Sequence, residues 1–193
     1  KVAPWDGEWQ GMDFLPKAGG KKWGSFWPDP RSRKPNRKGA ISWDAVGVAS
    51  SGQKEEWLLV EAKAHLSELA NPSARCNARK ASLRRIEAAL MTTYKSMTPA
   101  SRQPWDMVKS AWLGRYYQKA NRLASLYFLT RVVKLPARLV YVLFVGDDFK
   151  DAPVRKSEWV TAMETANRAL GLESKGLPGV HEVYLNVKGT RCP

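Results

Sequence analysis

The chain is poor in the residues that build zinc sites and disulfide frameworks. It has two cysteines, Cys76 and Cys192, and two histidines, His65 and His181, among 193 residues. The cysteines lie far apart in the sequence, and two histidines do not complete a zinc-type cluster with them. This usage favours two reduced thiols, so we expect a cytoplasmic protein.

Long apolar runs and the motifs of several common enzyme classes are also missing. No apolar segment approaches the length that spans a bilayer, so we expect no membrane association. The sequence contains no Gly-x-Ser-x-Gly elbow and no glycine pattern of the Walker or dinucleotide-binding type. These absences argue against the enzyme classes that depend on such motifs.

Negative charge is scarce relative to positive charge. Thirty-two lysines and arginines outnumber eighteen aspartates and glutamates, which gives a net charge of +14 and a pI near 10.0. The excess is clustered, with eight basic residues and one acidic residue in 17–38, and eleven basic and two acidic residues in 75–122. Clustering favours a face that binds a polyanion, of which nucleic acid is the commonest. An evenly solvated basic surface is the alternative.

Residues 1–40 are aromatic, basic and rich in glycine and proline. We interpret them as an arm packed on a domain formed by 41–193. The run 21–30 is predicted not to form a regular helix, and its tryptophans are expected to pack on the core. Tryptophan interleaved with lysine and arginine could also stack on bases. The loop 31–39 is expected to contact phosphates through Lys34, Arg37 and Lys38.

The apolar patterns after residue 40 predict an α/β domain with a mixed central sheet flanked by helices. We expect a hairpin within 41–65, a central strand at 139–145 covered on both faces, and a last strand at 180–187 at an edge. Helices are expected to begin at 71–73, to run over about 107–131, and to run from 157 to 170.

Polar residues on the first two of these helices suggest further contacts. Arg75 and Arg79 lie off the apolar stripe, which predicts a basic surface for nucleic acid. Gln118, Asn121 and Arg122 occupy neighbouring positions on the second helix. This polar patch could make hydrogen bonds between helices, and Gln118 and Arg122 are also expected to contact nucleic acid.

The hairpin carries charges where its second apolar strand should end. Residues 57–60 are fully apolar and are followed by Glu61, Ala62 and Lys63. Because side chains alternate along a strand, Glu61 and Lys63 project from the same face. Burying an acid and a base is costly unless they are paired, so this placement indicates a functional or structural role for the two residues. The alternative is an exposed pair at a strand end, which adds little to stability.

Asp44, followed across the hairpin by Glu61-Ala62-Lys63, resembles the PD-(D/E)XK nuclease superfamily, which has a restriction-endonuclease-like core. The resemblance spans about 41–145. It implies that Asp44, Glu61 and the main-chain carbonyl of Ala62 bind Mg²⁺ or Mn²⁺, and that Lys63 activates or orients the attacking water. It also implies that Gln118 and Asn121, on a helix after the motif strand, line the active-site cleft. Trp43 stands where the superfamily often has proline. Glu8 is the candidate for a further acidic residue that the family carries upstream.

The chemistry of these residue types agrees with the resemblance. Mg²⁺ prefers oxygen ligands and is usually held by one or two carboxylates, with water and phosphate completing the shell. Such an ion polarises a phosphodiester, and a neighbouring lysine stabilises developing negative charge. The sequence therefore predicts a Mg²⁺-dependent nuclease acting on nucleic acid, expected to be DNA. A nuclease-like binding module without hydrolysis and an interaction subunit remain alternatives, and Asp44 could simply bond to the hairpin backbone.

Overall fold

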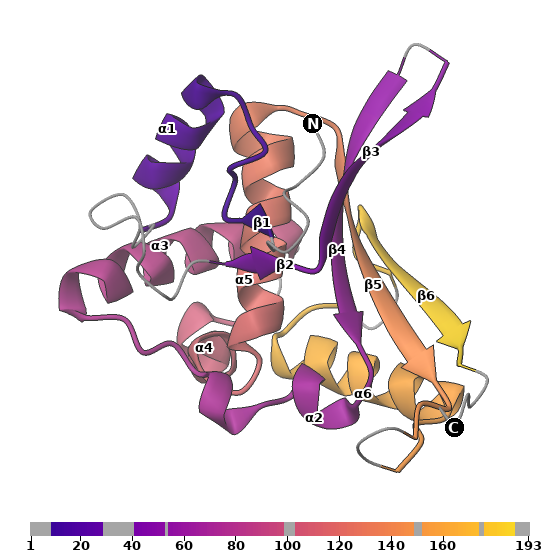
Figure 1. Cartoon of the computed structure of the whole chain (residues 1–193). Helices are drawn as coiled ribbons and strands as arrows, with labels where there is room; N and C mark the ends of the chain where they lie inside the picture. Colours follow the sequence, from indigo (N-terminus) through magenta and orange to yellow (C-terminus); the bar gives the residue numbers. More distant parts are fainter. Residues whose placement is uncertain are drawn as a thin grey trace.

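The computed structural model describes residues 9–28, 41–52, 54–98, 103–148, 152–173 and 176–187. Within these ranges a mixed four-stranded sheet packs against helices, as predicted for the α/β class (Figure 1). The sheet contains β3 (Ala45–Ser51), β4 (Lys54–Lys63), β5 (Ala137–Val145) and β6 (Val180–Asn186). A separate two-stranded ribbon pairs β1 (Trp9–Gln10) with β2 (Ser42–Trp43).

The helices connect these strands and supply most of the core. The longer ones are α1 (Lys17–Phe26), α3 (Lys80–Met97), α4 (Trp105–Leu113), α5 (Tyr117–Tyr127) and α6 (Lys156–Ala169). The shorter ones are α2 (Leu66–Leu69), the 3₁₀ helix η2 (Pro72–Ala74) and the π-helix η3 (Phe128–Val133). No helix in the described ranges has the length and apolar character needed to cross a bilayer.

The strand order β3-β4-β5-β6 determines where the helices lie. β3 and β4 form the predicted antiparallel hairpin, whose turn includes Gly52 at a φ of 61° that suits glycine. β4, β5 and β6 are parallel, so each connection between them crosses over the sheet. Because both crossovers step in one direction and such connections are right-handed, their helices share one face. Figure 1 shows the helices on that side.

β5 is central, as predicted, but only one of its faces is fully buried. Leu139, Tyr141 and Leu143 point toward the helices and are at most 1% exposed. On the opposite face Arg138 is exposed and Val140 is half-buried. The prediction of a strand covered on both faces is therefore wrong for the second face, which is only partly buried. β6 lies at the sheet edge, as predicted.

Residues 17–26 form α1, so the prediction that the run 21–30 does not form a regular helix is wrong for 21–26, and 29–30 lie outside the described residues. Pro16 precedes the helix and Pro28 follows it, so neither interrupts the hydrogen bonding. Trp23 and Trp27 stack with ring centroids 5.8 Å apart, and Trp23 packs edge-on against Phe128 at 5.0 Å. This burial outweighs the helix cost of the glycines, about 1 kcal/mol each. Both tryptophans belong to the core, as predicted.

Two other helix boundaries also differ from the predictions. The single helix expected over 107–131 is divided into α4, α5 and η3. The break contains Gly114, where a Cβ atom would lie 2.5 Å from the carbonyl oxygen of Ser110. The helix expected to begin at 71–73 begins at Lys80, because those residues form the separate turn η2. The helix predicted over 157–170 is confirmed as α6.

Candidate active site

The end of β4 brings an acid and a base together in the protein interior. Glu61 is 1% exposed and Lys63 is 7% exposed. The Oε1 atom of Glu61 lies 2.6 Å from the Nζ atom of Lys63. Leu59, two residues earlier on the same face, is fully buried. The predicted shared face is confirmed, and the alternative of an exposed pair at the strand end is wrong.

Arg122 on α5 is a second cation bonded to the same carboxylate. Its Nε atom donates to Glu61 Oε2 at 2.6 Å. Its Nη1 and Nη2 atoms donate to Asn121 Oδ1 at 3.1 Å and to the carbonyl of Ser42 at 2.5 Å. The guanidinium also lies over the Trp43 ring, 4.6 Å from its centroid. Arg122 thus connects α5 to β2 and β4, and both oxygens of Glu61 have cationic partners.

Asp44 lies between β2 and β3 and approaches the same segment through the backbone. Its Oδ2 atom accepts a hydrogen bond of 2.7 Å from the main-chain N–H of Ala62. Because Ala62 separates Glu61 from Lys63, this bond holds the Asp44 carboxylate beside the pair. Asp44 itself is exposed. The geometry agrees with a ligand that adjoins Glu61 and equally with the alternative of an acceptor for the hairpin backbone.

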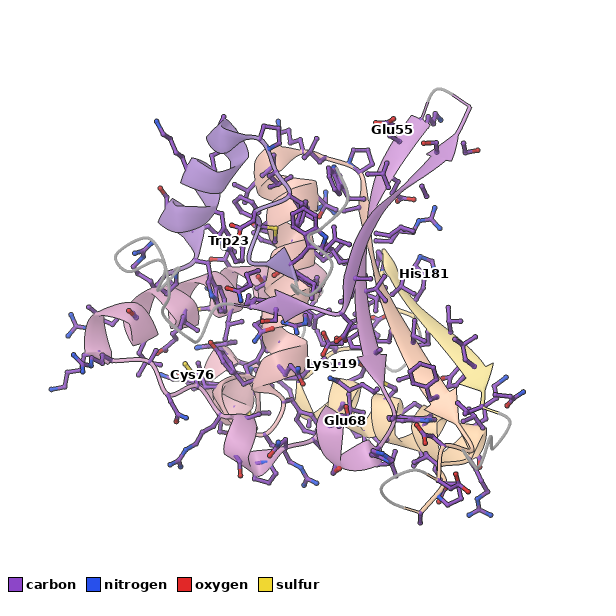
Figure 2. The ribbon with its side chains drawn as sticks, in the orientation of Figure 1. Trp23, Glu55, Glu68, Cys76, Lys119 and His181 are labelled. Carbon is purple, nitrogen blue, oxygen red and sulfur yellow. The ribbon has the colours of Figure 1, made fainter. Side chains whose placement is uncertain are left out.

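A narrow cavity adjoins this cluster and is lined by Glu61, Lys63, Glu68, Leu69, Gln118, Lys119, Arg122 and Tyr141. Figure 2 shows Lys119 between α5 and the sheet, with Glu68 below it. Tyr141 is paired with Glu61 in the strand register, and its buried hydroxyl has no hydrogen-bond partner in the described part of the chain. Burial, and then the charge of Glu61, raises the pKa of Tyr141. The phenol is therefore neutral and can donate a hydrogen bond.

Lys119 belongs to this cavity although no motif marks it. It is 3% exposed, and burial lowers its pKa to about 8 against the opposing attraction of Glu182. Its Nζ atom lies 4.9 Å from the ring centroid of Tyr141. The sequence does hold one signal, because Tyr116, Lys119 and Leu123 follow the spacing of an apolar helix face. A lysine at a core position of a helix is unusual enough to be singled out.

The residues predicted to contact nucleic acid through the N-terminal loop and the region before α3 are only partly described. Lys34, Arg37, Lys38 and the upstream acid Glu8 lie outside the described residues. The segment between η2 and α3 is basic and solvent-accessible. The exposed basic residues of this segment and the start of α3 are Arg75, Arg79, Lys80, Arg84 and Arg85.

The two predicted contacts on α5 have different positions. Gln118 is half-buried and lines the cavity beside Glu61. Arg122 is 4% exposed and is held by the bonds described above. Contact between Arg122 and nucleic acid would require those bonds to break. Asn121, the third member of the predicted polar patch, is buried and accepts one of them.

The oxygen atoms around Glu61 fit a hard divalent ion, provided that the ion replaces one of the cations bonded to Glu61. Asp44 and Glu61 offer carboxylate oxygens and Ala62 a carbonyl oxygen, which Mg²⁺ prefers. In the described ranges no three acidic, histidine or cysteine side chains converge on one point, so water and phosphate would complete the shell. Both oxygens of Glu61 are bonded to cations. An ion that reaches Glu61 must therefore replace Lys63 or Arg122 there.

Comparisons with protein-family models, with curated proteins and with solved structures found no match to this chain. The mixed α/β sheet is therefore a fold class and not a family assignment. The superfamily, the nucleic-acid partner, the metal and the cytoplasmic location stay predictions.

Proposed function

We propose that the chain is a Mg²⁺-dependent nuclease that hydrolyses phosphodiester bonds of DNA. The observation that carries this proposal is the 2.7 Å hydrogen bond between Asp44 Oδ2 and the N–H of Ala62. It holds one carboxylate against the segment that contains Glu61 and Lys63. Two carboxylates and a lysine brought together by the hairpin are the arrangement that the resemblance to the PD-(D/E)XK superfamily implies.

Each residue of the cluster has a chemical role in this proposal. Asp44, Glu61 and the carbonyl of Ala62 hold the ion, which when bound polarises the phosphodiester and acidifies a bound water. Lys63, once it leaves Glu61, faces the negative charge that develops on the phosphate. Arg122 orients the Glu61 carboxylate and compensates its charge before the ion arrives, because a buried carboxylate needs a cationic partner.

The charge distribution supports nucleic acid as the substrate. The chain carries a net charge of +14, and five exposed cations cluster around the start of α3. The chain reaches these cations directly from the end of β4 through α2 and η2. Lysine and arginine on such a surface release counterions from phosphates, which makes binding salt-dependent.

One observation favours a second candidate function, a module that binds nucleic acid without hydrolysing it. Lys63 and Arg122 already neutralise Glu61, at 2.6 Å each. Two cations around one buried carboxylate oppose the approach of a divalent ion. A protein with this function would bind nucleic acid in a salt-sensitive way, and neither a chelator nor loss of the Asp44 charge would alter that binding.

A cleavage assay distinguishes the two functions. The full chain is incubated with duplex, branched and single-stranded oligonucleotides in Mg²⁺, Mn²⁺ or EDTA. We expect cleavage that requires the ion and disappears in Asp44→Asn and Lys63→Met. Glu55→Gln, near the far tip of the hairpin (Figure 2), should cleave like the wild type.

Two results of this assay would overturn the nuclease proposal. Wild-type protein that binds these substrates but cleaves none of them, with either ion, would establish the binding module instead. Metal-dependent cleavage that persists in Asp44→Asn would place the activity outside this cluster.

A further inference from the structure

A second hollow lies between α6 and β6, and Lys119 lines it as well as the cavity beside Glu61. Its cavity volume is about 280 Å³. Volumes of this order accommodate small molecules. Val160 and Met163 contribute apolar surface, and Glu164 and Glu182 contribute carboxylates. None of these residues takes part in the function proposed above.

Buried polar groups in and beside this hollow lack ordinary partners. Asn167 lines it and is 6% exposed, and its Oδ1 atom accepts no hydrogen bond from any described residue. Lys119 is 3% exposed. Its Nζ atom contacts the sulfur of Met163 at 3.6 Å and lies over the Tyr141 ring. Most buried polar atoms in proteins are hydrogen-bonded. The unpartnered oxygen of Asn167 and the amine of Lys119 line the same hollow, so together they point to a ligand that would bond to them.

The protonation of Lys119 narrows the chemistry of that ligand. Burial lowers its pKa from 10.5 to about 8, so at pH 7 about a tenth of the amine is uncharged. The uncharged fraction exceeds that of an ordinary lysine by about two orders of magnitude. A desolvated, uncharged lysine that lines a hollow is a nucleophile toward carbonyl compounds.

We propose that this hollow binds a small uncharged aldehyde or ketone, which Lys119 captures as an imine. The amine nitrogen adds to the carbonyl carbon, and a proton moves from nitrogen to oxygen to give a carbinolamine. Loss of water then forms the C=N bond. Asn167 Oδ1 accepts a hydrogen bond from a ligand hydroxyl. Glu164 and Glu182 repel anionic oxo acids, which is why the ligand is uncharged.

Reductive trapping tests this proposal on the full chain. Glycolaldehyde is added with sodium cyanoborohydride near neutral pH, and the hydride converts each imine into a stable secondary amine. Peptide mass spectrometry then reports the rate at each lysine. We expect Lys119 to be alkylated at least about tenfold faster than the exposed Lys95, because its gain in uncharged amine outweighs slower entry. Urea should abolish the difference.

Variants at the mouth of the hollow test whether the aldehyde reaches Lys119 through this opening. Val160 is 37% exposed, so Val160→Trp narrows the mouth without entering the core, whereas Thr165→Trp lies on another side of α6. Alkylation of Lys119 should fall in Val160→Trp alone, and glyoxylate should react with Lys119 more slowly than glycolaldehyde. Any one of three results would overturn the proposal. Lys119 could react no faster than Lys95, Val160→Trp could leave the rate at Lys119 unchanged, or Lys119 could react faster with glyoxylate than with glycolaldehyde. Cleavage of nucleic acid plays no part in this readout.

Discussion

Glu61 on β4 and Arg122 on α5 are joined by a 2.6 Å ion pair between Oε2 and Nε, although the two residues are 61 positions apart in the sequence. Their side chains are only 2% and 5% exposed. Lys63 bonds to the other oxygen of Glu61. Removing one partner of a buried pair is strongly destabilising, because the remaining charge loses its compensation. Glu61 therefore supports the folded state as well as the proposed chemistry.

Replacing Glu61 should lower stability substantially. Glu61→Ala leaves Lys63 and Arg122 buried without their carboxylate, so the free energy of unfolding should fall by about 3–5 kcal/mol. Urea denaturation followed by circular dichroism measures this change. Glu55→Ala, on the same strand but exposed, should change stability by less than about 0.5 kcal/mol. Equal effects of the two substitutions would contradict the role assigned to the buried pair.

Replacing Arg122 should strengthen metal binding. Arg122→Met retains much of the packing on Trp43 and removes the charge that competes for Glu61. We expect Mn²⁺ affinity to rise at least tenfold, because a unit charge in contact is worth more than about 1.4 kcal/mol. Electron paramagnetic resonance of free Mn²⁺ measures the affinity. Arg138→Met, which breaks a more exposed pair with Glu56, is the matched control and should leave it unchanged.

An Arg122→Met protein that is folded by circular dichroism but binds Mn²⁺ no better than the wild type would contradict this competition. Such a result would mean that the ion, if bound, does not reach Glu61.

Much of the sheet could be predicted because its strands have local signatures. The hairpin combines apolar runs with a polar turn, and β6 shows an alternating pattern. α1 could not be predicted in this way, since Gly19, Gly20 and Gly24 lower its helix propensity. It forms because Trp23 gains tertiary contacts with Phe128, and those contacts are invisible to local patterns.

In the candidate site, too, some features could be predicted from local sequence patterns and others depend on tertiary packing. The shared face of Glu61 and Lys63 follows from strand periodicity alone. The bond from Arg122 to Glu61 does not, because no local pattern reports which residue of α5 faces β4. Spacing places Lys119 on the apolar face of α5, but its lowered pKa depends on burial by other elements. Local sequence patterns thus predict which face of a helix or strand a residue occupies. Tertiary packing determines which residues of different helices and strands bond to each other.

Lys119 should make stability depend on alkaline pH. Its pKa is about 8 in the folded state and 10.5 ordinarily, so below pH 8 both states are protonated and the buried ammonium disfavours folding. As pH rises from 8 to 10.5, the folded state loses this proton first, and the free energy of unfolding should rise by about 3 kcal/mol relative to Lys119→Met. Urea denaturation across this range measures it. A difference between the two proteins that stays constant with pH would contradict the burial of a titrating amine.

The exposed cations near α3 should control binding to nucleic acid. Replacing Arg79 and Arg84 with glutamine should weaken binding to any DNA sequence and reduce the slope of log affinity against log salt by up to about 2. Fluorescence anisotropy at several salt concentrations measures the slope. Replacing Arg131 and Arg168, which are equally exposed elsewhere, is the control. Equal slopes for the two double variants would mean that binding does not use this surface.

The most direct test of a metal site at Asp44 and Glu61 is a Mn²⁺ titration of the wild type and Asp44→Asn, followed by electron paramagnetic resonance. Asparagine retains an oxygen that can accept the Ala62 N–H but lacks the charge that a divalent ion requires. We expect the wild type to bind Mn²⁺ and the variant, with unchanged stability, to bind it at least tenfold more weakly, a loss of about 1.4 kcal/mol or more. Equal Mn²⁺ affinity in the two proteins, or no binding by the wild type, would contradict a metal site formed by Asp44 and Glu61.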